Sequence, residues 1–147
     1  MSKLGFKELI VWQKARALAV SVYQVAGCGA LSRDYGLCDQ MRRSAVSVPS
    51  NIAEGDERGS DKESVRYFCI AKGSLAELLT QLEIAREVGY LTSSEADAMS
   101  ERCVEVGKML GGLIKARRRF TVRLLLLGCS VGIGISTLPM PVLIGRL

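Results

Sequence analysis

The chain contains no histidine, and this absence removes the commonest catalytic chemistries. Without an imidazole there is no usual general base near neutral pH, no Ser-His-Asp or Cys-His arrangement and no metal site that uses histidine. Glu77 and Glu83 could be considered as paired carboxylates, but di-metal bundles normally combine such glutamates with Glu-x-x-His motifs. We therefore expect a protein that is not an enzyme and that carries no metal or other cofactor.

The five cysteines are odd in number, widely spaced and never arranged as C-x-x-C. This pattern matches neither a disulfide framework nor a zinc site, and no secretory signal peptide opens the sequence. We expect reduced thiols in a cytoplasmic protein, because a disulfide between helices would need an oxidising compartment. The cysteines are Cys28, Cys38, Cys69, Cys103 and Cys129.

The alternation typical of β-strands is also missing, and four segments instead repeat apolar residues every three or four positions. The first predicts a helix over residues 7–26, and the second predicts a helix that starts near Arg33 or Asp34. Pro49 should kink or briefly break the second helix, because proline lacks an N–H and collides with the preceding turn. The residues expected to be buried in these two helices are Val11, Ala15, Leu18, Val22, Val25, Leu37, Met41, Ala45, Val48 and Ile52.

Two capping boxes predict the starts of the third and fourth helices, namely Ser60 with Glu63 and Thr92 with Glu95. Residues 55–59 are expected to form a charged turn before the third helix, and Gly89 should end that helix. The residues expected to be buried in these two helices are Phe68, Ala71, Leu75, Leu78, Leu82, Ala85, Ala96, Met99, Cys103, Val106, Leu110 and Leu113.

Four amphipathic helices joined by short turns predict an all-α fold, an antiparallel up-down four-helix bundle over residues 1–118. Residues 119–147 form an apolar C-terminal tail, in which residues 124–145 carry no charge. The tail is long enough to be a membrane anchor that tethers an interaction protein, with basic residues just before it. Pro139, Pro141 and several glycines count against that hypothesis. A packed extension and a coding-frame accident remain alternatives.

The net charge of +5 is spread along the chain and favours an acidic partner such as nucleic acid. In the second helix a face opposite the apolar stripe combines arginines, which hold phosphate bidentately, with small hydroxyls that leave room for a phosphate or another helix. The next turn and the third helix add further cations. The candidate nucleic-acid-binding residues are Arg42, Arg43, Ser47, Ser50, Asn51, Arg58, Lys62, Arg66 and Lys72.

A purely structural role explains the same residues equally well. Arg42 and Arg43 could pair with Glu54, Glu77 or Glu83, and Arg58 and Lys62 could be solvated turn residues. Aromatic residues make up only 5% of the chain and are dispersed, so stacking on bases is weakly supported. Recognition of nucleic-acid shape and charge is the better hypothesis.

Two segments carry a resemblance to a known family. FKELIVWQKARA at residues 6–17, and residues 35–91 with RRSAVSVPSNIAEG and AKGSLAELLTQLEIA, resemble the bacterial four-helix-bundle proteins encoded in intervening sequences of 23S ribosomal RNA genes. The resemblance covers roughly residues 6–116. It implies a homo-oligomeric ring, usually a pentamer, with a basic surface suited to RNA. Relatives of the same fold are accessory proteins of diversity-generating retroelements that bind a reverse transcriptase and RNA, so this role is an alternative.

Overall fold

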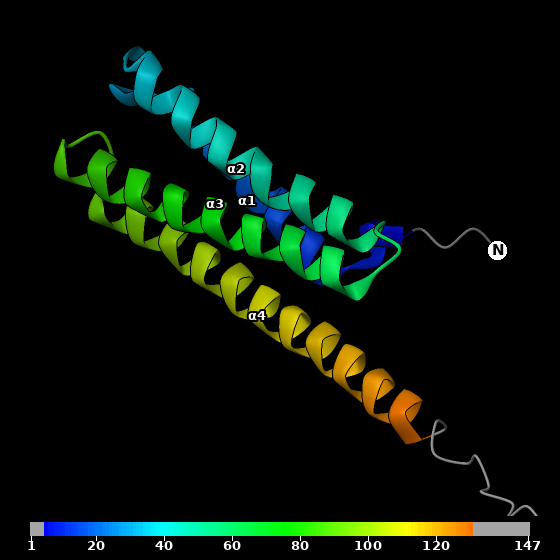
Figure 1. The fold of residues 1–147 in the computed structure, drawn as a ribbon. Helices are drawn as coiled ribbons and strands as arrows, with labels where there is room; N and C mark the ends of the chain where they lie inside the picture. The colour runs from blue at the N-terminus through cyan, green and yellow to red at the C-terminus, as the bar shows by residue number, and fades with distance from the viewer. Residues whose placement is uncertain (1–4, 131–147) are drawn as a thin grey trace, which may run out of the picture.

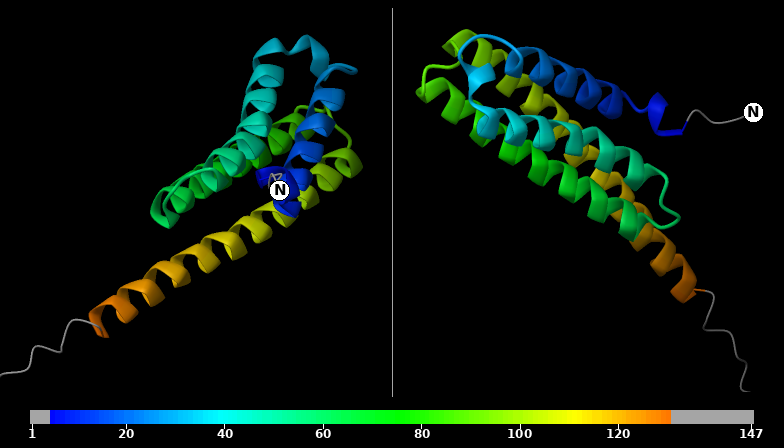
Figure 2. Two further views of the ribbon diagram at one scale, coloured as in Figure 1. Left: turned by 90° about the vertical axis from the view of Figure 1, so that its right-hand side faces the viewer. Right: turned by 90° about the horizontal axis from the view of Figure 1, so that it is seen from above.

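Four helices account for nearly all of residues 5–130, the part of the chain that the computed structural model describes. They are α1 (Ile10–Ala26), α2 (Tyr35–Asp56), α3 (Asp61–Glu87) and α4 (Ser93–Ser130), with short 3-10 turns at Gly5–Glu8 and Leu31–Arg33. Consecutive helices run in opposite directions and lie side by side (Figures 1 and 2). The described residues contain no strand, and the predicted all-α four-helix bundle is confirmed.

The predicted apolar stripes form the core almost throughout. All six predicted residues of α3 are buried, as are most of those predicted in the other helices. Three residues are only partly buried, namely Val25, Leu37 and Leu113, and Ile114 takes the place predicted for Leu113. Because an α-helix has 3.6 residues per turn, positions three and four residues beyond Leu110 flank the stripe on either side, and packing decides which is covered.

Pro49 does not break α2, so the short interruption expected there is wrong. The helix is continuous from Tyr35 to Asp56, with Pro49 half-buried inside it. Val48 and Ile52, on either side of the proline, are fully buried. Core packing therefore holds both halves of α2 in helical conformation and outweighs the one backbone hydrogen bond that proline cannot donate.

Gly55 is also part of α2, so the turn predicted to begin there begins two residues later. It is buried against α3, and a Cβ at this position would lie 2.6 Å from Cε1 of Phe68. The glycine is therefore required by the close approach of two helices rather than by the turn. Local sequence could not distinguish these two uses of glycine.

Both predicted N-caps form, and the second is a complete capping box, whereas in the first Glu63 accepts from the Ser60 hydroxyl rather than from its backbone N–H. The N–H of Glu63 donates to Ser60 Oγ at 3.3 Å, and the N–H of Glu95 donates to Thr92 Oγ1 at 3.3 Å. In the second box the N–H of Thr92 also donates to Glu95 Oε2 at 2.9 Å. The hydrogen bonds from the side chain and backbone of Thr92 lower the pKa of Glu95 below its ordinary value.

Helix α4 is much longer than its three neighbours and continues past residue 118, the boundary expected between bundle and tail. Its C-terminal end projects beyond the other helices (Figure 1). Within residues 5–130, no helix has an apolar stretch long enough to cross a membrane. The rest of the proposed anchor, residues 131–145, lies outside the described residues.

Replacing Gly55 with alanine should destabilise the bundle by about 1–3 kcal/mol, because the new methyl group overlaps the Phe68 ring and forces α2 and α3 apart. Urea unfolding followed by circular dichroism, at equal protein concentrations, measures the change. The matched control is Gly73→Ala in α3, where an added Cβ meets nothing within 4 Å. This change should stabilise by up to about 1 kcal/mol through helix propensity. Equal stability of Gly55→Ala and the parent would contradict the close-approach argument.

Candidate nucleic-acid interface

The small polar residues predicted on α2 face α3. Ser47 Oγ and Ser74 Oγ are joined by a hydrogen bond of 2.8 Å, and Asn51 Nδ2 donates to Ser47 Oγ at 3.0 Å and to the Ser47 carbonyl at 2.8 Å. One turn earlier, Ser44 donates to Gln81 Oε1 at 2.6 Å. We call these five residues the polar seam. The space left by the small side chains is filled by a neighbouring helix, which was one of the two uses expected for it.

Ser50 lies on the exposed side of α2, and its hydroxyl donates to the carbonyl of Val46 at 2.8 Å. Such a bond to the preceding turn is a common local arrangement of serine in helices. Ser50 therefore remains at the surface but has an internal acceptor for its proton.

Arg42 extends to the C-terminal end of α1. Its Nη2 donates to the carbonyl of Ala26 at 3.3 Å, and its guanidinium lies 5.4 Å from the centre of the Tyr23 ring. Cys38 Sγ lies 3.2 Å from the same carbonyl. A cation at a helix C-terminus interacts favourably with the negative end of the helix dipole. This position explains Arg42 as a helix-capping residue.

Arg58 is engaged by two neighbours. It forms an ion pair with Glu54, donates to Tyr67 Oη at 2.7 Å and lies 4.6 Å above the centre of the Tyr67 ring. The hydrogen bond to Glu54 is the largest cause that raises the pKa of Arg58. The guanidinium thus links the last turn of α2 to α3.

Arg43 is open to solvent, with 73% of its side chain exposed and only a long contact of 3.9 Å to Asp39. It lies at the edge of a groove of about 400 Å³ between α2 and α3. The other side of the groove carries Glu77, so its charges are mixed. The remaining lining residues are Gln40, Ser44, Ser47, Ile70 and Ser74.

Lys62, Arg66 and Lys72 are exposed along α3, and none forms an ion pair with a residue in the described part of the chain. Between Glu105 and residue 118 of the adjacent helix α4, three more exposed cations were not among the predicted residues. They are Lys108, Lys115 and Arg118. A sequence signal for them exists, because no Asp or Glu follows Glu105.

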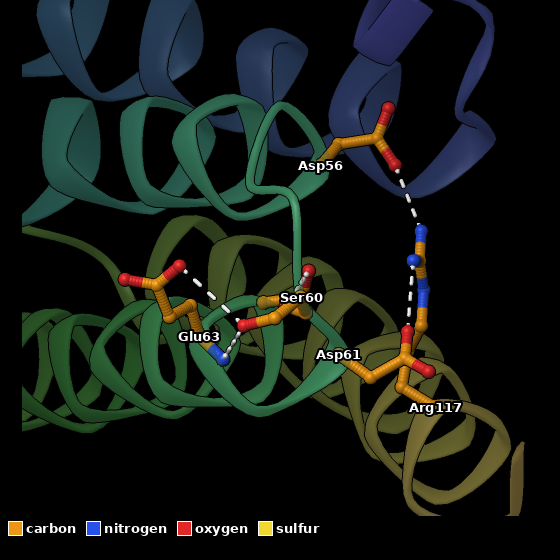
Figure 3. Close-up of polar contacts among 6 residues, drawn as sticks. Asp56, Ser60, Asp61, Glu63 and Arg117 are labelled. Atoms are coloured by element: carbon orange, nitrogen blue, oxygen red, sulfur yellow. Dashed lines mark hydrogen bonds and ion pairs between the residues drawn. The ribbon is translucent and has the colours of Figure 1, made fainter. Parts of the chain in front are cut away.

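Arg117 joins three helices at the end of the bundle where α4 projects (Figure 3). Its Nη2 donates to Asp56 Oδ1 at 3.2 Å, at the end of α2, and its Nη1 donates to Asp61 Oδ1 at 3.1 Å, at the start of α3. Both carboxylates are largely shielded from water, with 18% and 23% of their side chains exposed. We call this arrangement the Arg117 clamp.

The described residues provide no cluster suited to a metal ion, since no three or more His, Cys, Asp and Glu side chains are grouped there. Cys28, Cys38, Cys69 and Cys103 are free thiols. Burial raises the pKa of Cys103 to about 12, which leaves it protonated and a poor nucleophile near neutral pH.

The fold defines a class: a small four-helix-bundle protein whose exposed surface combines cations and carboxylates. The model of the 23S rRNA-intervening sequence protein family matches residues 7–112, and the chain belongs to this family. The fold is shared with a crystal structure described as a protein with unknown function from the S23 ribosomal protein family of Bacteroides thetaiotaomicron. The TM-score is 0.67 at 23% identity, over 72% of this chain and 99% of that chain. A search of curated proteins found no match.

Substituting Arg117 with glutamine should lower stability by about 1–3 kcal/mol, because two shielded carboxylates lose their charged donor. Chemical unfolding at low and high salt measures the loss, which should shrink as salt screens the charges. Arg118→Gln provides the control, because it removes the same charge from an exposed neighbouring position. Equal stability of the two variants would show that the clamp contributes nothing.

Proposed function

We propose that the chain is a non-enzymatic, homo-oligomeric scaffold that binds RNA or another nucleic acid through a basic surface. The observation that supports this proposal best is the set of exposed cations on α3, Lys62, Arg66 and Lys72, which have no carboxylate partner among the described residues. Unpaired surface cations of this kind attract phosphate through interactions that are independent of sequence and sensitive to salt.

The geometry favours some of the nine predicted residues over others as direct contacts. Lys62, Arg66, Lys72 and Arg43 are open to a ligand, whereas Arg42 and Arg58 are held by neighbouring helices. The polar seam contains Ser47 and Asn51, so these side chains support the helices that carry the cations.

Membership of the 23S rRNA-intervening sequence protein family makes ribosomal RNA, and the intervening sequence in particular, the first RNA to consider. An accessory role beside a reverse transcriptase would use the same basic surface. Gene neighbourhood would separate the two roles, because an accessory protein of a retroelement should be encoded beside a reverse transcriptase and a template repeat.

Self-association, with a pentamer as the expected form, is supported by an apolar groove of about 490 Å³ between α1 and α2. Val20, Tyr23 and Val46 line it and are 52%, 50% and 41% exposed. Exposed apolar side chains gathered in one groove are typical of a protein-binding surface. A second copy of the chain is the occupant that this proposal requires.

Binding of the purified full-length chain to its 23S intervening RNA, and to an unrelated RNA duplex, should weaken steeply as salt rises. Replacing Lys62, Arg66 and Lys72 with glutamine should reduce the slope of log affinity against log salt by about 2–3. Fluorescence anisotropy measures both effects, and sedimentation and circular dichroism check assembly and folding. Failure of a folded oligomer to bind either RNA at low salt would refute the nucleic-acid proposal.

A further inference from the structure

Charge is separated along the length of α4. The carboxylates of this helix lie before residue 106, at Glu95, Asp97, Glu101 and Glu105, and every charged residue after them in the sequence is a cation. The change of sign falls at Lys108, well inside the bundle, so it does not mark the end of the helix. The favourable interaction of cations with the negative end of a helix dipole does not explain this change of sign, because α4 continues far beyond Lys108, to Ser130.

The register between α3 and α4 brings the two sets of cations together. Arg117 of α4 contacts Asp61 at 3.1 Å, near the start of α3, and a Cβ added to Gly107 would lie 3.8 Å from Cδ1 of Leu75. Because the helices are antiparallel, these two contacts place Lys62 near the level of Arg118, and Lys72 near that of Lys108.

Helical periodicity places Lys72 and the α4 cations at the edge where α3 and α4 meet, whereas Lys62 and Arg66 lie about 100° and 140° round α3 from Asp61, Lys62 on the outward side and Arg66 nearer α2. Lys72 lies eleven residues, close to three turns, after Asp61, which faces α4. On α4, Arg118 lies three heptads after Asp97, which contacts Arg86 of α3 at 3.7 Å. Lys115 precedes Arg118 by one turn. Both helices therefore present cations along one shared face.

Four of the five carboxylates between residues 54 and 63 have a partner in the structure, and Glu57 is the exception among these described residues. Asp56 and Asp61 are bound by Arg117, and Glu54 is paired with Arg58. Glu63 accepts a hydrogen bond of 3.4 Å from Ser60 Oγ in the helix cap (Figure 3). In residues 54–72 and 106–118 together, eight cations outnumber five carboxylates, so this part of the surface keeps a net positive charge, which favours binding of an external anion.

The surface of α4 between Lys108 and Lys115 is recessed, because two glycines without side chains lie there. Gly111 and Gly112 lie between Lys108 and Lys115, and a Cβ at either glycine would meet nothing within 4 Å. A backbone of phosphates can therefore approach the helix closely at this point, while the lysine side chains reach it from either side.

We infer that the cations of this shared face form one site for the phosphate backbone of double-stranded RNA, and this inference rests on the proposed function. Two rows of cations, on helices whose axes lie roughly 8–10 Å apart, can reach both strands of a duplex. Over residues 5–118, none of the aromatic residues lies on this face, so single strands would find no stacking platform. The five residues, called the basic α3–α4 face, are Lys62, Lys72, Lys108, Lys115 and Arg118.

The test compares two triple variants of the full-length chain that remove the same charge. Lys108→Gln/Lys115→Gln/Arg118→Gln changes the α4 half of the face, and Lys7→Gln/Arg33→Gln/Arg102→Gln changes exposed cations elsewhere. For a blunt RNA duplex, the first variant should bind at least about tenfold more weakly, with a salt slope lower by about 2–3. The control should retain most of the affinity and slope.

Each outcome has a distinct meaning once circular dichroism and sedimentation show that both variants fold and assemble. Equal losses in the two variants, or no loss in either, would overturn the basic α3–α4 face and leave nucleic-acid binding itself intact. Tighter binding of a single strand of the same sequence would overturn the preference for duplex. If only anionic phospholipid vesicles bind in a way that depends on the α4 cations, the face belongs to a membrane contact, and the proposed function fails with it.

Discussion

The close packing of α2 on α3 is the constraint on which the rest of the structure depends. Gly55 admits the ring of Phe68, and the small side chains of Ser47 and Ser74 meet in a hydrogen bond along the same interface. Close contact between helices requires small residues, and buried hydroxyls require partners. Both requirements are met by the same few positions. Helices α1 and α4 then pack on this central pair.

This constraint also determines which polar residues remain for a ligand. The hydroxyls and the amide of the polar seam bind one another, Arg42 caps α1 and Arg58 binds Glu54 and Tyr67. Buried and half-buried polar groups must find partners inside the protein, whereas long cationic side chains at the surface lose little by remaining in water. The residues left open are therefore charged side chains on outward faces, and the cations among them suit phosphate better than a reacting group.

The two ends of the bundle differ in a way that links stability to the proposed function. The Arg117 clamp satisfies Asp56 and Asp61 where three helices meet, and the nearby cations of α3 and α4 keep their positive charge. A single arginine thus fastens the turn between α2 and α3 to α4 and offsets part of the charge of two carboxylates that would otherwise oppose the basic α3–α4 face. Repulsion among the remaining cations is the cost of such a surface, and a bound polyanion would relieve it.

The sequence by itself determined the helical class, the two N-caps and nearly all of the core, because apolar periodicity and hydrogen bonds over three residues are local properties. Tertiary structure alone decided that Pro49 and Gly55 lie inside α2, since packing against neighbouring helices outweighs their local preferences. The tertiary structure also decided which polar residues are exposed to solvent. Ser47 and Lys62 are equally plausible ligands in the sequence, but the first faces a helix and the second faces water. Lys72 of α3 lies at the level of Lys108 of α4 because of the register between two antiparallel helices, and no local sequence pattern encodes that register.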